Sequence, residues 1–66
     1  MRQARFSTDG IVTTRGEDVF RYKKGEKVSI VEECNEHLSR VLIREGEGAG
    51  ETVMVDNDQL MSLIIN

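Results

Sequence analysis

The fold is decided by residues 19–33, which read VFRYKKGEKVSIVEE. In the second half of this stretch, Val28 and Ile30 lie on one side of a period-two pattern, which is typical of a β-strand with one buried face. Before them, Gly25 holds the third position of the turn over residues 23–26, where a type II turn requires a positive φ. The stretch therefore predicts a tight turn followed by a strand over residues 27–33.

Downstream of this strand, the same alternation returns twice. Val41 and Ile43 alternate with outward positions over residues 38–44, after a short polar connection at residues 34–37. The segment 45–50 contains three glycines, which can adopt a positive φ and are typical of a hairpin loop. We therefore expect a return strand at residues 51–55.

The two ends of the chain complete the expected sheet. Residues 56–60 carry capping and turn residues that suit one short turn of 3-10 helix, and residues 61–65 form a last strand. Residues 3–8 can form a first strand, whereas residues 8–17 are expected to be a long irregular stretch.

These segments predict an all-β fold, because no run of ten or more residues carries the apolar spacing of an α-helix. Five short strands with regular turns indicate a small barrel or two packed sheets. The expected core residues are Phe20, Tyr22, Val28, Ile30, Val41, Ile43, Val53, Val55 and Leu60.

Length and composition limit the class of protein. Sixty-six residues suit one domain, residues 1–66, and 38% hydrophobic with 32% charged residues is typical of a soluble globular chain. No apolar run approaches the length of a transmembrane helix, so we expect no membrane partner and a cytoplasmic location. A short chain that starts at Met1 also fits a bacterial or phage gene product.

The central stretch and the tail together resemble SH3 domains, including the bacterial SH3-like ones. Phe20 and Tyr22 stand where that family keeps two core side chains, and Gly25-Glu26 stands at its diverging turn. The tail, residues 53–65, is similar to the family's strand, 3-10 turn and closing strand. The resemblance spans roughly residues 17–65 and implies a five-stranded SH3-like barrel with a short 3-10 turn before the last strand.

The chain departs from this family in the residues that bind ligands. Residues 36–40 lack the tryptophan of the third strand, and Gln59 replaces a tyrosine near the 3-10 turn. A groove without aromatic rings cannot hold a polyproline helix, so a proline-rich peptide is not the expected ligand. The SH3-like type II dihydrofolate reductases carry a Val-Gln-Ile-Tyr strand, which residues 53–56 of this chain do not match.

No group of residues predicts catalysis, a metal site or a cofactor. Cys34 and His37 are three residues apart in an expected loop, but nothing supplies a third orienting group or an oxyanion pocket. The carboxylates are expected to be solvated, and residues 56–58 lack the glycine and terminal glutamate of a calcium loop. We therefore expect no enzyme activity.

The charges lie unevenly along the chain and suggest two kinds of partner. Residues 1–27 hold seven basic and four acidic side chains (+3), whereas residues 28–66 hold two basic and eight acidic ones (−6). The leading interpretation is a non-catalytic protein-interaction module, a small regulatory or accessory protein that binds a partner protein or a second copy of itself. An acidic surface that binds a basic partner would consist of Glu45, Glu47, Glu51, Asp56 and Asp58.

Two further surfaces follow from the same residues. Val31, Leu42 and Met54 point away from the expected core and would form an apolar patch if their strands are adjacent. The alternative function is nucleic-acid binding, which is less favoured because the pI is about 5.0 and Tyr22 faces the expected core. That alternative would use Arg15, Arg21, Lys23, Lys24 and Lys27.

Overall fold

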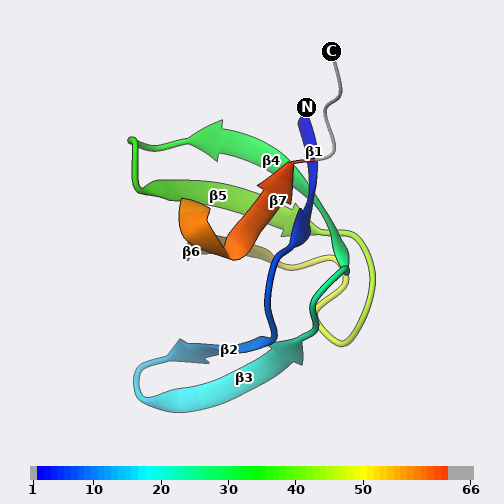
Figure 1. Cartoon of the computed structure of the whole chain (residues 1–66). Helices are drawn as coiled ribbons and strands as arrows, with labels where there is room; N and C mark the ends of the chain where they lie inside the picture. Colours follow the sequence, from blue (N-terminus) through cyan, green and yellow to red (C-terminus); the bar gives the residue numbers. More distant parts are fainter. Residues whose placement is uncertain (1, 63–66) are drawn as a thin grey trace.

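The computed structural model describes residues 2–62, which form seven β-strands and one 3-10 helix (Figure 1). Five strands make one antiparallel sheet in the order β6-β5-β4-β1-β7, and the other two make a hairpin. The bounds are β1 Arg2–Phe6, β2 Gly10–Thr14, β3 Glu17–Tyr22, β4 Lys27–Glu33, β5 Leu38–Ile43, β6 Thr52–Asp56, η1 Asn57–Gln59 and β7 Leu60–Ser62. The predicted all-β fold, with five strands in one sheet and a 3-10 turn before the last strand, is confirmed.

The five-stranded sheet is strongly curled and forms a half-barrel (Figure 1). Val28 pairs with Ile43 and Ile30 with Val41, so the apolar positions of β4 and β5 face the same side. A register shift between Ile30 and Glu32 makes Val31 a bulge residue, and bulges of this kind increase the local twist of a strand. The alternation read from the sequence therefore becomes one concave apolar face.

The expectation of an irregular stretch at residues 8–17 is wrong, because β2 and β3 form a hairpin there. Val12 pairs with Phe20, and Thr14 pairs with Glu17 across a two-residue turn. Arg15 and Gly16 in this turn both have a positive φ, of 56° and 81°, as in the type I′ turn that matches the twist of a hairpin. In Figure 1 the hairpin extends away from the five-stranded sheet.

The ends of the predicted strands shift by a few residues. The first strand was expected at residues 3–8, whereas β1 ends at Phe6, where the chain turns toward the hairpin. The last strand was expected at residues 61–65; β7 begins at Leu60, and residues 63–65 lie outside the described residues. Ser7 hydrogen-bonds through its backbone N–H to the Gln59 carbonyl oxygen at 2.8 Å, which holds the end of β1 beside the 3-10 helix.

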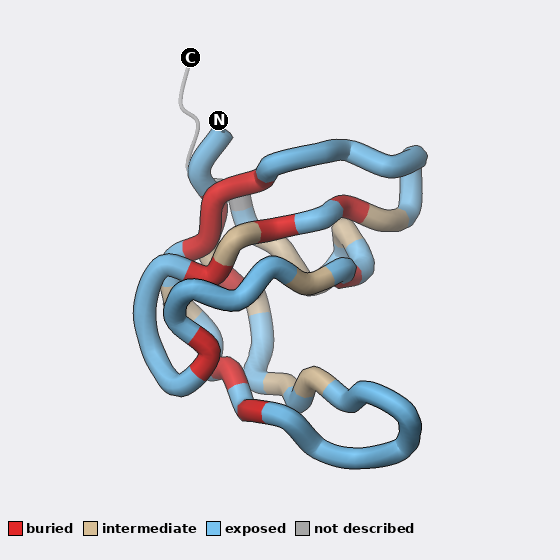
Figure 2. Tube along the Cα trace, turned by 180° about the vertical axis from the view of Figure 1, so that it is seen from behind, coloured by how far each residue is buried: buried red, intermediate tan, exposed pale blue. Residues whose placement is uncertain are grey.

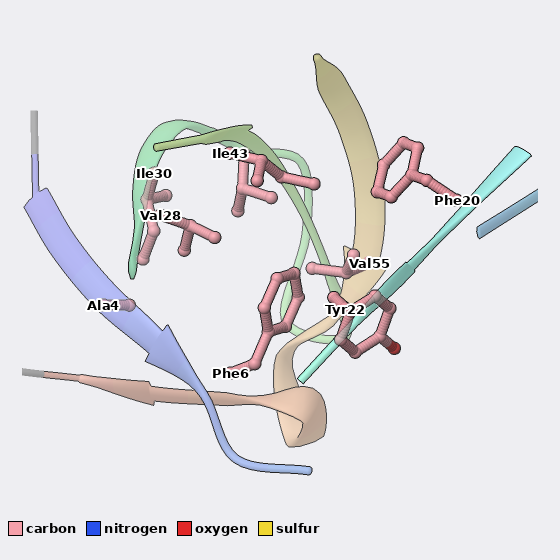
Figure 3. Packing of buried hydrophobic residues seen from close by; sticks show 9 residues of the cluster. Ala4, Phe6, Phe20, Tyr22, Val28, Ile30, Ile43 and Val55 are labelled. Atoms are coloured by element: carbon pink, nitrogen blue, oxygen red, sulfur yellow. The ribbon is translucent and has the colours of Figure 1, made fainter. Parts of the chain in front are cut away.

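The core lies between the concave face of the sheet and the base of the hairpin, where the buried segments in Figure 2 gather. Phe6 and Tyr22 stack with ring centroids 3.8 Å apart and an angle of 18° between the rings, so they join β1 to β3 (Figure 3). Two predicted core residues, Val53 and Leu60, are only partly buried, and the sequence did not predict Ala4 and Phe6. The buried cluster consists of Ala4, Phe6, Phe20, Tyr22, Val28, Ile30, Val41, Ile43 and Val55.

Candidate partner-binding surface

The acidic loop between β5 and β6 folds back onto the turn that precedes β4. Gly46 and Gly50 have positive φ values of 86° and 92°, which allow the loop to reverse direction. The Glu47 carboxylate accepts a hydrogen bond from the backbone N–H of Arg21 at 2.8 Å, and the Glu45 carboxylate accepts one from Lys27 at 2.9 Å. Two of the predicted acidic-surface residues are thus bound to the backbone of the predicted basic segment.

Two more carboxylates accept hydrogen bonds from the backbone of the basic turn, which we define as residues 21–27. Glu26 accepts from the backbone N–H of Lys23 at 2.6 Å, and Asp9 accepts from the backbone N–H of Lys24 at 2.8 Å. Four carboxylates therefore bind the backbone of a turn that carries four cationic side chains, although no ion pair between these groups is formed among residues 2–62. The fold thus brings two residues of the predicted acidic surface, Glu45 and Glu47, onto the predicted basic segment.

The other predicted charged residues lie apart from this cluster. Arg15 is exposed at the tip of the hairpin, at the opposite end from Tyr22, so it does not join the basic turn. Glu51 precedes β6, Asp56 ends it and Asp58 lies in η1, and all three are exposed. The predicted acidic surface is thus divided: Glu45 and Glu47 contact the basic turn, Glu51 ends the same loop, and Asp56 and Asp58 lie at the 3-10 helix, at the other end of β6.

The folded state raises the pKa of the Tyr22 hydroxyl. Burial of its side chain, and secondly the negative charge of Asp56, raise the pKa of the Tyr22 hydroxyl above its usual value of 10.0. A group whose folded pKa is raised contributes its full stability below the unfolded pKa and loses it as the pH rises through the folded pKa. The neutral phenol is therefore the form that the folded state prefers.

We predict that the folded protein loses stability at alkaline pH, above about 10, as Tyr22 ionises. The absorbance of the phenolate reports this residue alone, because the chain has one tyrosine and no tryptophan. Asp56→Asn should bring the pKa of Tyr22 only part of the way back to its usual value, since burial is the larger cause. The Tyr22→Phe variant should not show the loss of stability at alkaline pH that the ionisation of Tyr22 causes. A titration midpoint at or below that of the urea-unfolded chain would contradict the prediction.

An apolar patch lies on the convex face of the sheet, away from the core. Met54 on β6 is 49% exposed, Val31 on β4 is 44% exposed and Leu42 on β5 is half-buried. Met54 lies opposite Arg40, and Leu42 lies opposite Thr52. β4, β5 and β6 are neighbours in the sheet, so these three apolar side chains lie on adjacent strands, as the predicted patch requires. We call Val31, Leu42 and Met54 the outer patch. The ion pair between Arg40 and Glu32, 2.8 Å long, lies within it.

The convex face also carries a group of cationic side chains that no pattern along the sequence predicts. Arg5 pairs with Lys27 in the β1–β4 ladder, and the backbone N–H of Arg44 donates to the Lys27 carbonyl oxygen at 2.9 Å. We call Arg5, Lys27 and Arg44 the basic row. Arg5 and Arg44 are 39 positions apart in the sequence, and only the register of two strand pairs places them on either side of Lys27.

The side chains that most often take part in catalysis lie in the loop between β4 and β5. Cys34 and His37 are exposed, and His37 Nε2 lies 3.5 Å from the Glu36 carboxylate. Among residues 2–62, no three histidine, cysteine or acidic side chains come close enough together to hold a metal ion. In the same part of the chain, no helix is long and apolar enough to cross a membrane.

Comparison with protein-family models, with curated proteins and with solved structures finds no match for the chain.

Proposed function

We propose that the chain is a non-catalytic protein-interaction module on an SH3-like barrel, which binds a partner protein or a second copy of itself. Three features support the SH3-like frame: the strand order β6-β5-β4-β1-β7, the hairpin inserted between β1 and β4, and the 3-10 helix before β7. They agree with the resemblance that residues 17–65 show to that family. One fold can host many functions, so the surface residues rather than the SH3-like frame determine what this chain binds.

The outer patch is the observation that carries the proposal. Solvent-exposed apolar residues are ordinary when scattered, but a group on neighbouring strands is typical of a surface that another protein covers. Met54 lies opposite Arg40, one outward position along β5 from the half-buried Leu42, and Arg40 and the Glu32 that follows Val31 neutralise each other. A partner that covers this patch would bury apolar area without leaving a single unpaired charge beneath it.

The test is capture of a partner from nuclease-treated lysate of the source cells, with the wild-type chain compared with Met54→Lys. We expect Met54→Lys to reduce the recovered partner by about tenfold, because the substitution places an unpaired charge in an apolar contact. Val19→Lys is the matched control, since Val19 is 53% exposed on the hairpin and the change in charge is the same. Light scattering of the purified chain at micromolar concentration tests self-association with the same variants.

Equal capture by wild type, Met54→Lys and Val19→Lys would contradict the proposal, as would the absence of both capture and self-association. Recovery that collapses after nuclease treatment would instead favour nucleic-acid binding. The exposed Lys23 and Lys24 side chains favour that second function, whereas the four carboxylates bound to the basic turn weaken it. Lys23→Gln with Lys24→Gln would then abolish the recovery.

A further inference from the structure

The basic row lies on the convex face of the sheet. Both neighbours of Arg5 along the chain, Ala4 and Phe6, are buried in the core, as are Val28 after Lys27 and Ile43 before Arg44. Successive residues in a strand point to opposite faces, so Arg5, Lys27 and Arg44 point outward together. They occupy one row across β1, β4 and the residue that follows β5, next to an open hollow lined by Gln3, Lys27, Arg44 and Glu45.

Three like charges in one row oppose folding. Directly opposed residues in an antiparallel pair have Cβ atoms about 4.5–5.5 Å apart, and like charges at such positions are destabilising. Among residues 2–62, none of the three side chains has a carboxylate oxygen within the 4.0 Å of an ion pair. Arg5 donates instead to the Gly25 carbonyl oxygen at 2.6 Å and Arg44 to the Ser29 hydroxyl at 3.1 Å. The Glu45 carboxylate, bound to the Lys27 backbone, is the nearby negative charge in the hollow.

We infer that the basic row binds an acidic segment of a partner protein. The inference rests on the proposed function and names the chemistry of the partner. Two guanidinium groups and one ammonium group in a row match successive carboxylates, and arginine can bind a carboxylate through two parallel hydrogen bonds. Met61, 44% exposed, pairs with Arg5 and extends the row with an apolar side chain. An acidic segment with an interspersed apolar residue fits this surface.

The aromatic residues favour a protein segment over single-stranded nucleic acid. Proteins that bind single strands stack the bases on exposed rings. Phe6, Phe20 and Tyr22 are the only aromatic residues of the chain, and all three are buried in the core. The row can therefore attract an anionic chain, but no ring is available to hold a base.

The test measures the anisotropy of a labelled polyglutamate peptide at low ionic strength. The double substitution Lys27→Gln and Arg44→Gln should weaken binding about tenfold, because two exposed charge pairs are lost. Lys23→Gln with Lys24→Gln removes the same charge from the basic turn and should change the affinity less than about threefold. Glu45→Gln, which keeps an acceptor for the Lys27 N–H, should strengthen binding. Arg5 stays unchanged in all variants, because its contact with Gly25 also supports the turn.

Three outcomes would overturn the inference. Equal losses in the two double variants would mean that only the net charge attracts the peptide. Tighter binding of an oligothymidylate than of polyglutamate, with the same dependence on Lys27 and Arg44, would assign the row to nucleic acid. No binding of polyglutamate, together with capture that depends on Met54, would reject the acidic segment and leave the proposed function intact. If no partner is captured from lysate either, both the inferred acidic segment and the proposed protein-interaction function are wrong.

Discussion

Phe6→Ala is expected to leave most of the protein unfolded at room temperature. The Phe6 side chain is fully buried and stacks on Tyr22, so it fills the space between the sheet and the base of the hairpin (Figure 3). Truncation of a buried phenylalanine costs about 3–5 kcal/mol through lost burial and the cavity left behind. A single core in a domain of this size rarely supplies more than about 3–5 kcal/mol of net stability. The loss therefore equals most or all of the free energy of unfolding.

Urea denaturation followed by circular dichroism measures this effect, and two variants make the result interpretable. Phe6→Leu keeps much of the volume and should remain folded with a lower midpoint, because it removes less buried surface and leaves a smaller cavity than Phe6→Ala does. Val19→Ala also shortens an apolar side chain, but Val19 is exposed, so its free energy of unfolding should stay within about 0.5 kcal/mol of wild type. A Phe6→Ala chain with a wild-type midpoint would show that the stacked pair does not hold the hairpin to the sheet.

The five strands of the sheet could be predicted because their apolar residues recur at every second position. Val28, Ile30, Val41 and Ile43 alternate in this way, and their burial follows directly from the pattern. Phe6 was missed as a core residue because β1 is short and its neighbours in the sequence are polar. Only the stacking partner on β3, sixteen residues away, explains its burial.

The hairpin was missed for a different physical reason. A type I′ turn usually carries Asn-Gly or Asp-Gly, because both central residues need a positive φ. Here Arg15 takes the first of these positions, and arginine is not a residue that favours the left-handed region. The run of β-branched residues from Ile11 to Thr14 was the available signal for a strand.

The candidate surface could be predicted only where it follows from alternation within one strand. Alternation predicted that Val31, Leu42 and Met54 point outward, and strand adjacency then made them a patch. The basic row needs the register between β1, β4 and β5, and the contact of Glu47 with Arg21 joins residues 26 positions apart. Such contacts depend on strand register and on the path of the loops, and no local pattern in a single sequence predicts either.

The side chain of Asn57 links the 3-10 helix to the loop between β4 and β5, and its removal is expected to have the second largest effect. Its Oδ1 accepts a hydrogen bond from the Ser39 hydroxyl at 2.6 Å, and its Nδ2 donates to the Glu36 carbonyl oxygen at 3.0 Å. Ser39 is 2% exposed, so its hydroxyl would be buried without an acceptor in Asn57→Ala. An orphaned buried polar group costs about 1–3 kcal/mol.

A double-mutant cycle separates this mechanism from a general loosening of the loop. We expect Asn57→Ala to lower the free energy of unfolding by about 2 kcal/mol, and Ser39→Ala in that background to restore part of it, because the unpaired hydroxyl is then gone. Strictly additive losses would contradict the mechanism. The basic row lies on the convex face, so folded Asn57→Ala protein should bind polyglutamate as wild type does. A parallel loss of binding in that variant would mean that the 3-10 helix takes part in the interaction surface.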